Sequence, residues 1–144
     1  MIHHGDILRL RSGQAPTRSN LLQETLTEQV IGAAIEVHRE LGPGLMESAY
    51  EECLCHELHL RNLRFERQMP LPVRYKGVNL DCGYRIDLVV EDSLILELKC
   101  IEHILPVYEA QLLTYLKLTG KRVGLILNFN VSVLTRGGLI RKVL

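Results

Sequence analysis

The sequence predicts a mixed α/β domain in which helices flank a central mixed sheet. Three observations lead to this fold class. Apolar residues first recur at helical spacing, then at a period of two, and then at helical spacing again before a last apolar strand. The chain has 144 residues, of which 47% are hydrophobic, enough for one domain with an aliphatic core. We expect residues 1–20 to form a flexible tail and residues 21–144 to form the domain.

Two helices are expected before the sheet. The first begins where the apolar stripe starts, with Thr25 or Thr27 as its cap. It ends before Gly42-Pro43-Gly44, because a glycine after the last turn and a following proline stop a helix. The second helix is expected from about residue 46 to residue 63.

A period of two then predicts strands. The first, over residues 65–75, contains Pro70 and Pro72, so we expect it to be irregular or at a sheet edge. Later elements are a turn at 76–77, strands over 79–90 and 94–100, a helix over 106–118, a strand over 123–128 and a short strand or hairpin around 137–138. The predicted order is therefore α-α-β-β-β-α-β-β.

Charge and hydropathy exclude some classes of protein. Lys plus Arg and Asp plus Glu are balanced at 17 each, which argues against a highly charged nucleic-acid coat protein. A neutral chain can still bind phosphates through a local basic strip. There is no apolar run of membrane-spanning length and no signal-peptide pattern. We therefore expect a cytoplasmic protein that does not act at a membrane.

Cysteine and histidine crowd into one stretch, at Cys53, Cys55, His56 and His59. One interpretation is a structural metal site, although no cysteine pair has the C-x-x-C spacing of a zinc ribbon. The other is free thiols and surface histidines on a helix in a reducing cytosol. Both interpretations remain open at this level.

Three charged residues interrupt two otherwise apolar strands. Side chains alternate along residues 94–100, so Glu97 and Lys99 share one face and the leucines take the other. Counting back across a three-residue loop at 91–93 puts Asp87 directly opposite Glu97 on the preceding strand. The sequence thus predicts two carboxylates about 5 Å apart, with a lysine one pleat away.

Opposed like charges destabilise a sheet, so a compensating group is expected. A divalent cation, Mg²⁺ or Mn²⁺, suits carboxylate ligands, polarises a phosphoryl group and lowers the pKa of a bound water. Lys99 can orient that water or stabilise transition-state charge. Asp87, Glu97 and Lys99 therefore predict a phosphodiester-hydrolysis site. The alternative is a solvated ion pair on an amphipathic strand.

Further segments accompany this triad. They are residues 42–50 (GPGLMESAY), 75–77 (YKG), 97–99 (ELK), 110–117 (AQLLTYLK) and 124–129 (GLILNF). Together with the order of elements they resemble the PD-(D/E)xK nuclease superfamily, whose restriction-endonuclease-like fold has an αβββαβ core. More narrowly, they resemble the small bacterial proteins labelled GxxxExxY. The likeness spans about residues 26–143, with Pro43 where the label has glycine and Ile86 where the superfamily name has proline.

The resemblance implies roles for three more residues. It suggests that an acid of an early helix, here Glu47, joins Asp87 and Glu97 as a metal ligand. Gln111 and Tyr115 resemble an accessory motif of the RecB-like branch that lies near the active site. Each residue also has a structural interpretation: the helix dipole favours Glu47 in a first turn, and Tyr115 can simply pack on the sheet.

The sequence therefore predicts a Mg²⁺- or Mn²⁺-dependent nuclease that acts on nucleic acid, in the first instance DNA. The alternative is a catalytically silent module of the same fold that binds nucleic acid or a protein. A single small domain has little room for separate recognition elements. We therefore expect a homodimer or a partner protein to supply specificity.

Overall fold

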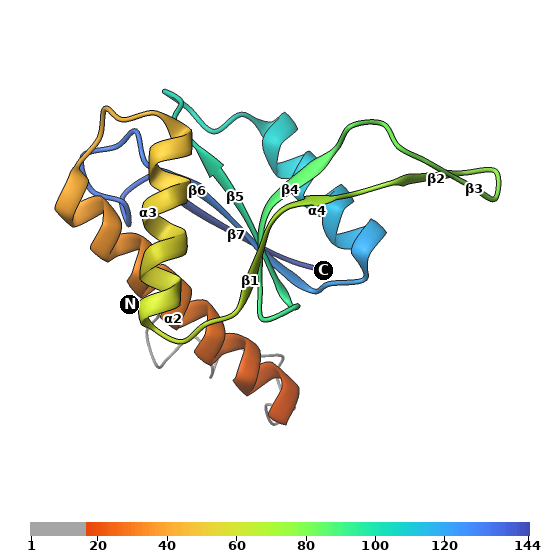
Figure 1. Cartoon of the computed structure of the whole chain (residues 1–144), viewed down its shortest axis with the longest axis horizontal. Coiled ribbons are helices and arrows are strands. Elements are labelled where there is room, and N and C mark those ends of the chain that lie inside the picture. Colours follow the sequence, from red (N-terminus) through yellow and green to blue (C-terminus); the bar gives the residue numbers. More distant parts are fainter. Residues whose placement is uncertain (1–16) are drawn as a thin grey trace.

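The computed structural model describes residues 17–144, so residues 1–16 of the predicted tail lie outside it. Its elements are labelled in Figure 1. They are α2 (Arg18–Leu41), α3 (Glu47–Leu60), β1 (Phe65–Pro70), β2 (Val73–Tyr75), β3 (Val78–Leu80), β4 (Arg85–Val90), β5 (Leu94–Lys99), α4 (Pro106–Thr119), β6 (Val123–Asn128) and β7 (Leu139–Val143).

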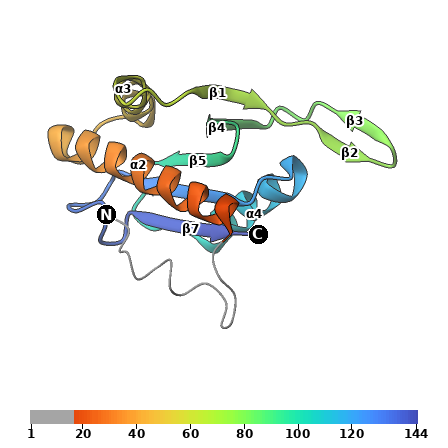
Figure 2. The same ribbon diagram turned by 90° about the horizontal axis from the view of Figure 1, so that it is seen from below.

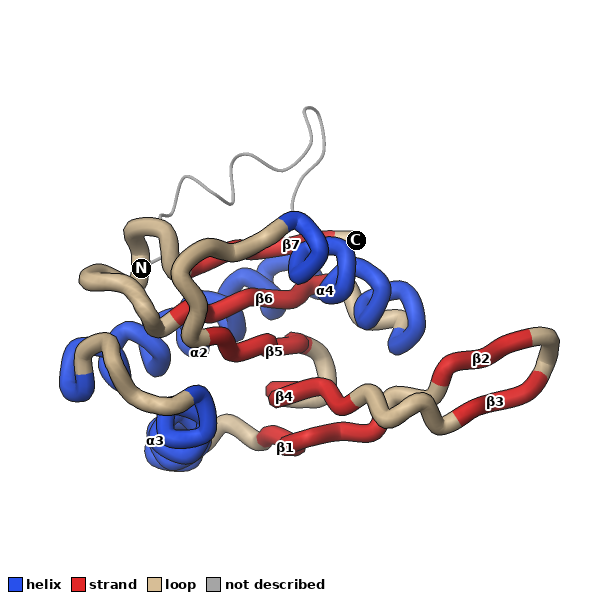
Figure 3. The backbone as a smooth tube through the Cα atoms, turned by 90° about the horizontal axis from the view of Figure 1, so that it is seen from above, coloured by secondary structure: helices blue, strands red, loops and turns tan. Residues whose placement is uncertain are grey.

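A five-stranded sheet in the order β1-β4-β5-β6-β7 forms the centre of the fold (Figures 2 and 3). β5 and β6 are parallel, and the other neighbouring pairs are antiparallel. The parallel pair requires a crossover, which α4 provides. The predicted mixed sheet is confirmed, and the run α3-β1-β4-β5-α4-β6 has the expected αβββαβ order, with a hairpin inserted after β1.

The core has two halves, one on each face of the sheet. Leu94, Leu96 and Leu98 pack with residues of α2 and α3, whereas Ile95 packs with residues of α4. β5 is therefore covered on both sides, as strands with a parallel neighbour usually are. The alternation predicted for this strand is confirmed.

β2 and β3 form a separate hairpin that extends away from the sheet (Figure 1). The single strand predicted over residues 79–90 is wrong, because a turn separates β3 from β4. In that turn Gly83 has φ 79° and its N–H donates to Asp81 Oδ1 at 2.9 Å. Pro70 and Pro72 do interrupt the preceding segment, and β1 lies at the sheet edge as predicted.

The first helix begins earlier than predicted. Thr17 Oγ1 accepts the Asn20 N–H at 3.0 Å, so α2 starts at Arg18 and includes the last residues of the predicted tail. The hydroxyls of Thr25 and Thr27 bond to carbonyls one turn back inside the helix instead of capping it. The two threonines, a residue type typical of helix caps, therefore lie within the helix.

The other helix ends are close to prediction. α3 ends at Leu60 rather than at residue 63, and Asn62 follows in the left-handed region with φ 60°. α4 has Pro106 in its first turn and Gly120, with φ 73°, as its C-cap, both as predicted. Within residues 17–144, none of the helices has the length and apolar character that crossing a bilayer requires.

Tyr50 fixes the junction between α2 and α3. Its ring is fully buried and stacks on Phe129 with centroids 4.5 Å apart. Its hydroxyl donates to the Gly42 carbonyl and accepts the Leu45 N–H at 3.2 Å. The turn before α3 is therefore tied to the core, which determines where Glu47 begins the helix.

We expect Tyr50→Phe to lower the free energy of unfolding by about 1–2 kcal/mol, because it leaves two main-chain groups without their partner. Urea denaturation measures this. Tyr75→Phe is the control, since Tyr75 is 59% exposed and its hydroxyl is in the solvent-facing hairpin. Equal stability of Tyr50→Phe and the unmodified protein would contradict the assignment.

Candidate active site

The strand pairing of β4 breaks at Asp87. On the β1 side, the residue pairs before and after it form, but Gln68 and Asp87 do not pair. On the β5 side, pairing ends at Leu88 with Leu96. The register is the one predicted from the loop at 91–93, so Asp87 and Glu97 are the next residues facing each other. Asp87 is thus unpaired on both sides of its strand.

The side chains of Asp87 and Glu97 each accept a hydrogen bond from a main-chain N–H of the neighbouring strand. The Asp87 N–H donates to Glu97 Oε2 at 3.0 Å, and the Leu98 N–H donates to Asp87 Oδ2 at 2.8 Å. Each carboxylate accepts an N–H that a main-chain carbonyl would accept in a regular sheet. The two acids are therefore held side by side by main-chain groups.

The regular alternation of faces along β4 also breaks here. Leu88 packs in the core half of α2 and α3, whereas Ile86, two residues away, packs in the half of α4. Strict alternation therefore fails at Asp87. Arg85, two residues before it, forms an ion pair with Asp81 at 3.5 Å.

Glu97 lies in an unfavourable place for a negative charge. Its side chain is buried, and burial first, then the nearby Asp87 charge, raise the pKa of Glu97 to about 8. The Lys99 charge opposes this shift. An apolar environment and a neighbouring acid thus act together on Glu97, and a cation at this place would relieve both effects.

Lys99 is at the end of β5, beside α4. Its ammonium lies 4.6 Å from the ring centroid of Tyr108. Its positive charge opposes the rise in the pKa values of Glu47 and Glu97 that burial and Asp87 cause. The cation–π contact with Tyr108 positions the Lys99 ammonium and leaves its charge in place.

Gln111 and Tyr115 meet on one face of α4, as their spacing predicts. Gln111 Nε2 donates to the Tyr115 hydroxyl at 2.8 Å. Tyr115 is buried, and burial followed by the Glu97 charge raises the pKa of Tyr115 to about 12. The α4 pair therefore lies on the Glu97 side of the sheet.

Comparison with known families agrees with this arrangement. The sequence model of the PD-(D/E)XK nuclease superfamily matches residues 24–142. The chain belongs to this superfamily. Its mixed sheet with flanking helices is consistent with a restriction-endonuclease-like fold, as predicted. A search of curated proteins and a search of solved structures each found no match.

In this PD-(D/E)XK domain, Glu47 approaches Asp87 from α3. It begins the helix and lines a small pocket of about 270 Å³ that also contains Ser48, Glu51, Gln68 and Asp87. Partial burial first, and then the Asp87 charge, raise the pKa of Glu47. Tyr50, its neighbour in the Glu-x-x-Tyr pattern, has the structural role described above.

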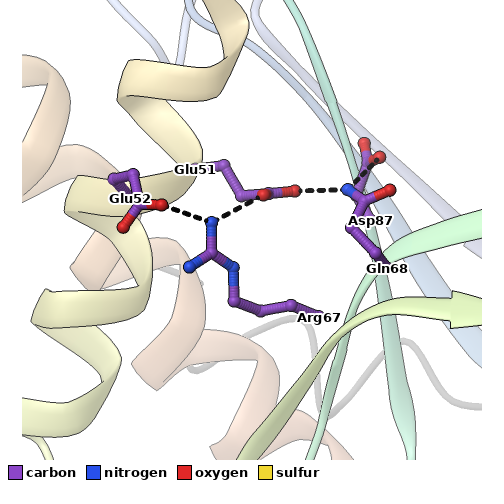
Figure 4. Close-up of polar contacts among 5 residues, drawn as sticks. All are labelled: Glu51, Glu52, Arg67, Gln68 and Asp87. Carbon is purple, nitrogen blue, oxygen red and sulfur yellow. Dashed lines mark hydrogen bonds and ion pairs between the residues drawn. The ribbon is translucent and has the colours of Figure 1, made fainter.

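Gln68 is a residue of the site that the sequence does not reveal. Its side-chain amide donates to Glu51 Oε1 at 2.7 Å and to Asp87 Oδ1 at 3.4 Å (Figure 4). Arg67 forms ion pairs with both Glu51 and Glu52, at 2.9 and 2.8 Å. Gln68 has φ 50°, a left-handed conformation that its strand-like sequence does not predict.

The described residues contain pairs of acids rather than a ready cluster of metal ligands. Between residues 17 and 144, no three His, Cys, Asp or Glu side chains are arranged to hold an ion. Glu47 therefore does not form such a cluster with Asp87 and Glu97. The stretch from Cys53 to His59, in which Cys55 is buried, does not form one either. The adjoining acids that remain, Asp87 and Glu97, still fit a hard cation that completes its shell with water and phosphate.

Asn128 secures the loop that follows Lys99. Its side chain accepts the Ile101 N–H at 3.1 Å and donates to the Ile101 carbonyl at 2.9 Å. Asn128 is almost fully buried. The loop between β5 and α4 is thereby anchored next to the site.

The raised pKa of Glu97 predicts a pH dependence of stability in the metal-free protein. Between 4.5, the ordinary value, and about 8, the folded state holds this proton more tightly than the unfolded state. The free energy of unfolding should therefore fall as pH rises through this window, with a contribution approaching about 1 kcal/mol per pH unit.

Urea denaturation in EDTA across this pH range measures the effect, with Glu97→Gln as the comparison. The amide cannot ionise, so the variant should lack this part of the slope and gain stability relative to the unmodified protein as pH rises. If the free energies of unfolding of the two proteins change with pH in parallel, Glu97 does not have the raised pKa described here.

Proposed function

We propose that this PD-(D/E)XK domain is a metal-dependent nuclease that hydrolyses phosphodiester bonds in DNA. Membership of the superfamily supports nuclease activity. The observation that carries the proposal is that main-chain N–H groups hold the Asp87 and Glu97 carboxylates side by side, with Lys99 two residues further along β5. Two acids and an ammonium at one end of a strand pair match the needs of phosphodiester hydrolysis.

The metal ligands in this proposal are Asp87 and Glu97, and Glu47, which lines one pocket with Asp87, is proposed to move toward the ion from α3 when it binds. Nucleases of the superfamily generally use divalent metal ions. Mg²⁺ and Mn²⁺ suit carboxylate oxygens, and Mg²⁺ commonly takes only one or two carboxylates besides water and substrate phosphate. When bound, the cation supplies positive charge to the phosphate and lowers the pKa of a water.

The remaining side chains position groups around the reacting phosphate. Lys99 donates hydrogen bonds to the attacking water or to a phosphate oxygen and offsets the negative charge that develops there. Water attacks phosphorus in line and the bond to the leaving oxygen breaks. Gln111 and Tyr115 hold the α4 wall of the site against Glu97, which keeps that carboxylate directed toward Asp87.

A second candidate is a catalytically silent module that binds nucleic acid or a protein partner. One observation favours it. The Asp87 and Glu97 carboxylates each accept a main-chain N–H, and no third acid in residues 17–144 completes a cluster with them. A site whose acids serve only to join two strands would look similar.

The finer assignments follow the same proposal. We place the protein among the GxxxExxY proteins, on the strength of the residues 42–50 and 97–99. We propose a cytoplasmic location, supported by free cysteines in the described residues. Sequence preference is proposed to come from a homodimer or a partner protein, since the domain is small.

Removing a site acid should abolish cleavage. We expect Asp87→Ala and Glu97→Ala to lose at least about 100-fold in cleavage rate of single- and double-stranded DNA in Mg²⁺ or Mn²⁺, because each removes a metal ligand. Glu40→Ala, at an exposed acid near the end of α2, is the control and should keep full activity. Undiminished activity of both site variants would rule the proposal out.

Metal binding separates the nuclease from the silent module. Mg²⁺ should raise the melting temperature of the protein, by a stabilisation of about 3 kcal/mol at roughly 100 times its Kd. Glu97→Gln should show little of this effect. If saturating Mg²⁺ and Mn²⁺ leave the melting temperature of the unmodified protein unchanged, the silent module becomes the better account.

A further inference from the structure

An apolar groove of about 630 Å³ lies between α4 and the chain on either side of the β2–β3 hairpin. Its volume is within the range of about 300–1,000 Å³ typical of small-molecule sites. Tyr84 at the base of the hairpin is 43% exposed, and Val107 and Leu118 on α4 are 62% and 44% exposed. These side chains leave an uncovered apolar surface next to the site.

Residues of the groove also neighbour the candidate active site. Tyr108 lines the groove and also holds the ammonium of Lys99 over its ring at 4.6 Å. Gln111 and Tyr115 line the groove as well, and the charge of Glu97 contributes to the raised pKa of Tyr115. A molecule in the groove would therefore lie next to a phosphate bound at Lys99 and Glu97.

Aromatic rings form part of the groove surface. Tyr84 contacts Tyr115 edge-on, with centroids 6.2 Å apart and planes at 69°. A ring fixed in this way and still exposed offers a rigid face for stacking. Stacking on aromatic side chains is how proteins bind unpaired bases with little regard to sequence.

The charges near the groove favour a polyanion. Residues 73–80 of the hairpin include Arg74 and Lys76 and no acid. Outside the candidate active site, two acids near the groove are paired: Asp81 with Arg85 at 3.5 Å, and Glu109 of α4 with Lys142 at 2.6 Å. The hairpin therefore presents uncompensated positive charge where a strand leaving the groove would pass.

We propose that the groove binds an unpaired nucleobase of the substrate strand, next to the phosphate at Asp87, Glu97 and Lys99. The inference rests on the proposed nuclease function and narrows its substrate to single-stranded or frayed nucleic acid. The bases of a closed duplex are stacked inside it and cannot enter the groove. Polar groups are few here, Gln111 and Thr114 among them, so sequence preference is weak.

Binding of oligonucleotides in EDTA tests this without requiring cleavage. The probes are fluorescein-labelled oligothymidylate, oligouridylate and a GC-rich blunt duplex, followed by anisotropy at one fixed salt concentration. The variants are Tyr84→Ser, which removes the stacking ring, and Val107→Gln, which makes the wall polar without adding charge. Leu22→Gln is the matched control, because Leu22 is also 62% exposed and also lies in the first turns of a helix.

We expect both groove variants to weaken binding of the single strands by about tenfold, in line with the loss of one stacked base. Duplex binding should be unchanged in them, and Leu22→Gln should bind like the unmodified protein. Thermal melts establish that each variant is folded. If Tyr84→Ser does not fold, Val107→Gln, a substitution at an exposed position, tests the inference by itself.

Three results would overturn the inference. If single-strand binding is unchanged in the groove variants while the protein still binds or cuts DNA, the groove is not a base site and the nuclease proposal stands. If the variants instead change the sedimentation of the protein alone, the groove joins two copies of the chain. If no probe binds and no DNA is cut, the inference fails together with the proposed function.

Discussion

A sheet normally satisfies its main-chain N–H groups with carbonyls of the neighbouring strand, and at one place in this protein carboxylates do so instead. Glu97 accepts the N–H of Asp87, and Asp87 accepts the N–H of Leu98. This exchange requires that β4 leave its regular pairing at Asp87. The change of faces along β4 and the proximity of the two acids both depend on that departure.

The surrounding elements hold this irregularity in place. Gln68 adopts a left-handed conformation opposite Asp87, and its amide links that acid to Glu51 of α3. Tyr50 fixes the turn from which α3 starts. On the other face of the sheet, α4 brings Tyr115 near Glu97, whose charge raises the pKa of Tyr115. The acids would otherwise repel each other, so their closeness reflects constraints imposed by three separate parts of the chain.

Features that depend on local pattern could be predicted from the sequence. The three-residue loop at 91–93 fixes the register of β4 and β5, and so brings Asp87 opposite Glu97. Proline and glycine mark both ends of α4. Alternation along β5 assigns its leucines and Glu97 to opposite faces. The superfamily likeness rests on these same segments.

Features that depend on tertiary structure could not be predicted. Nothing in the local sequence indicates that Gln68 leaves the strand conformation, because its partner is distant in the chain. The buried acid Glu24, which pairs with Arg141 across 117 residues, looks like an ordinary surface residue of a helix. The turn at Asp81 and Gly83 has a recognisable local signature, but apolar residues on both sides outweighed it.

The break opposite Gln68 also affects how the molecule meets others of its kind. β1 is an edge strand, and an unbroken edge invites strands of other chains to add to the sheet. Here a left-handed residue interrupts β1, and Pro70 ends it without an N–H to offer. The charged side chain of Arg67 borders the same stretch. The irregularity that frees Asp87 thus also guards this edge against aggregation, so a change that restored regular pairing would affect solubility as well as the site.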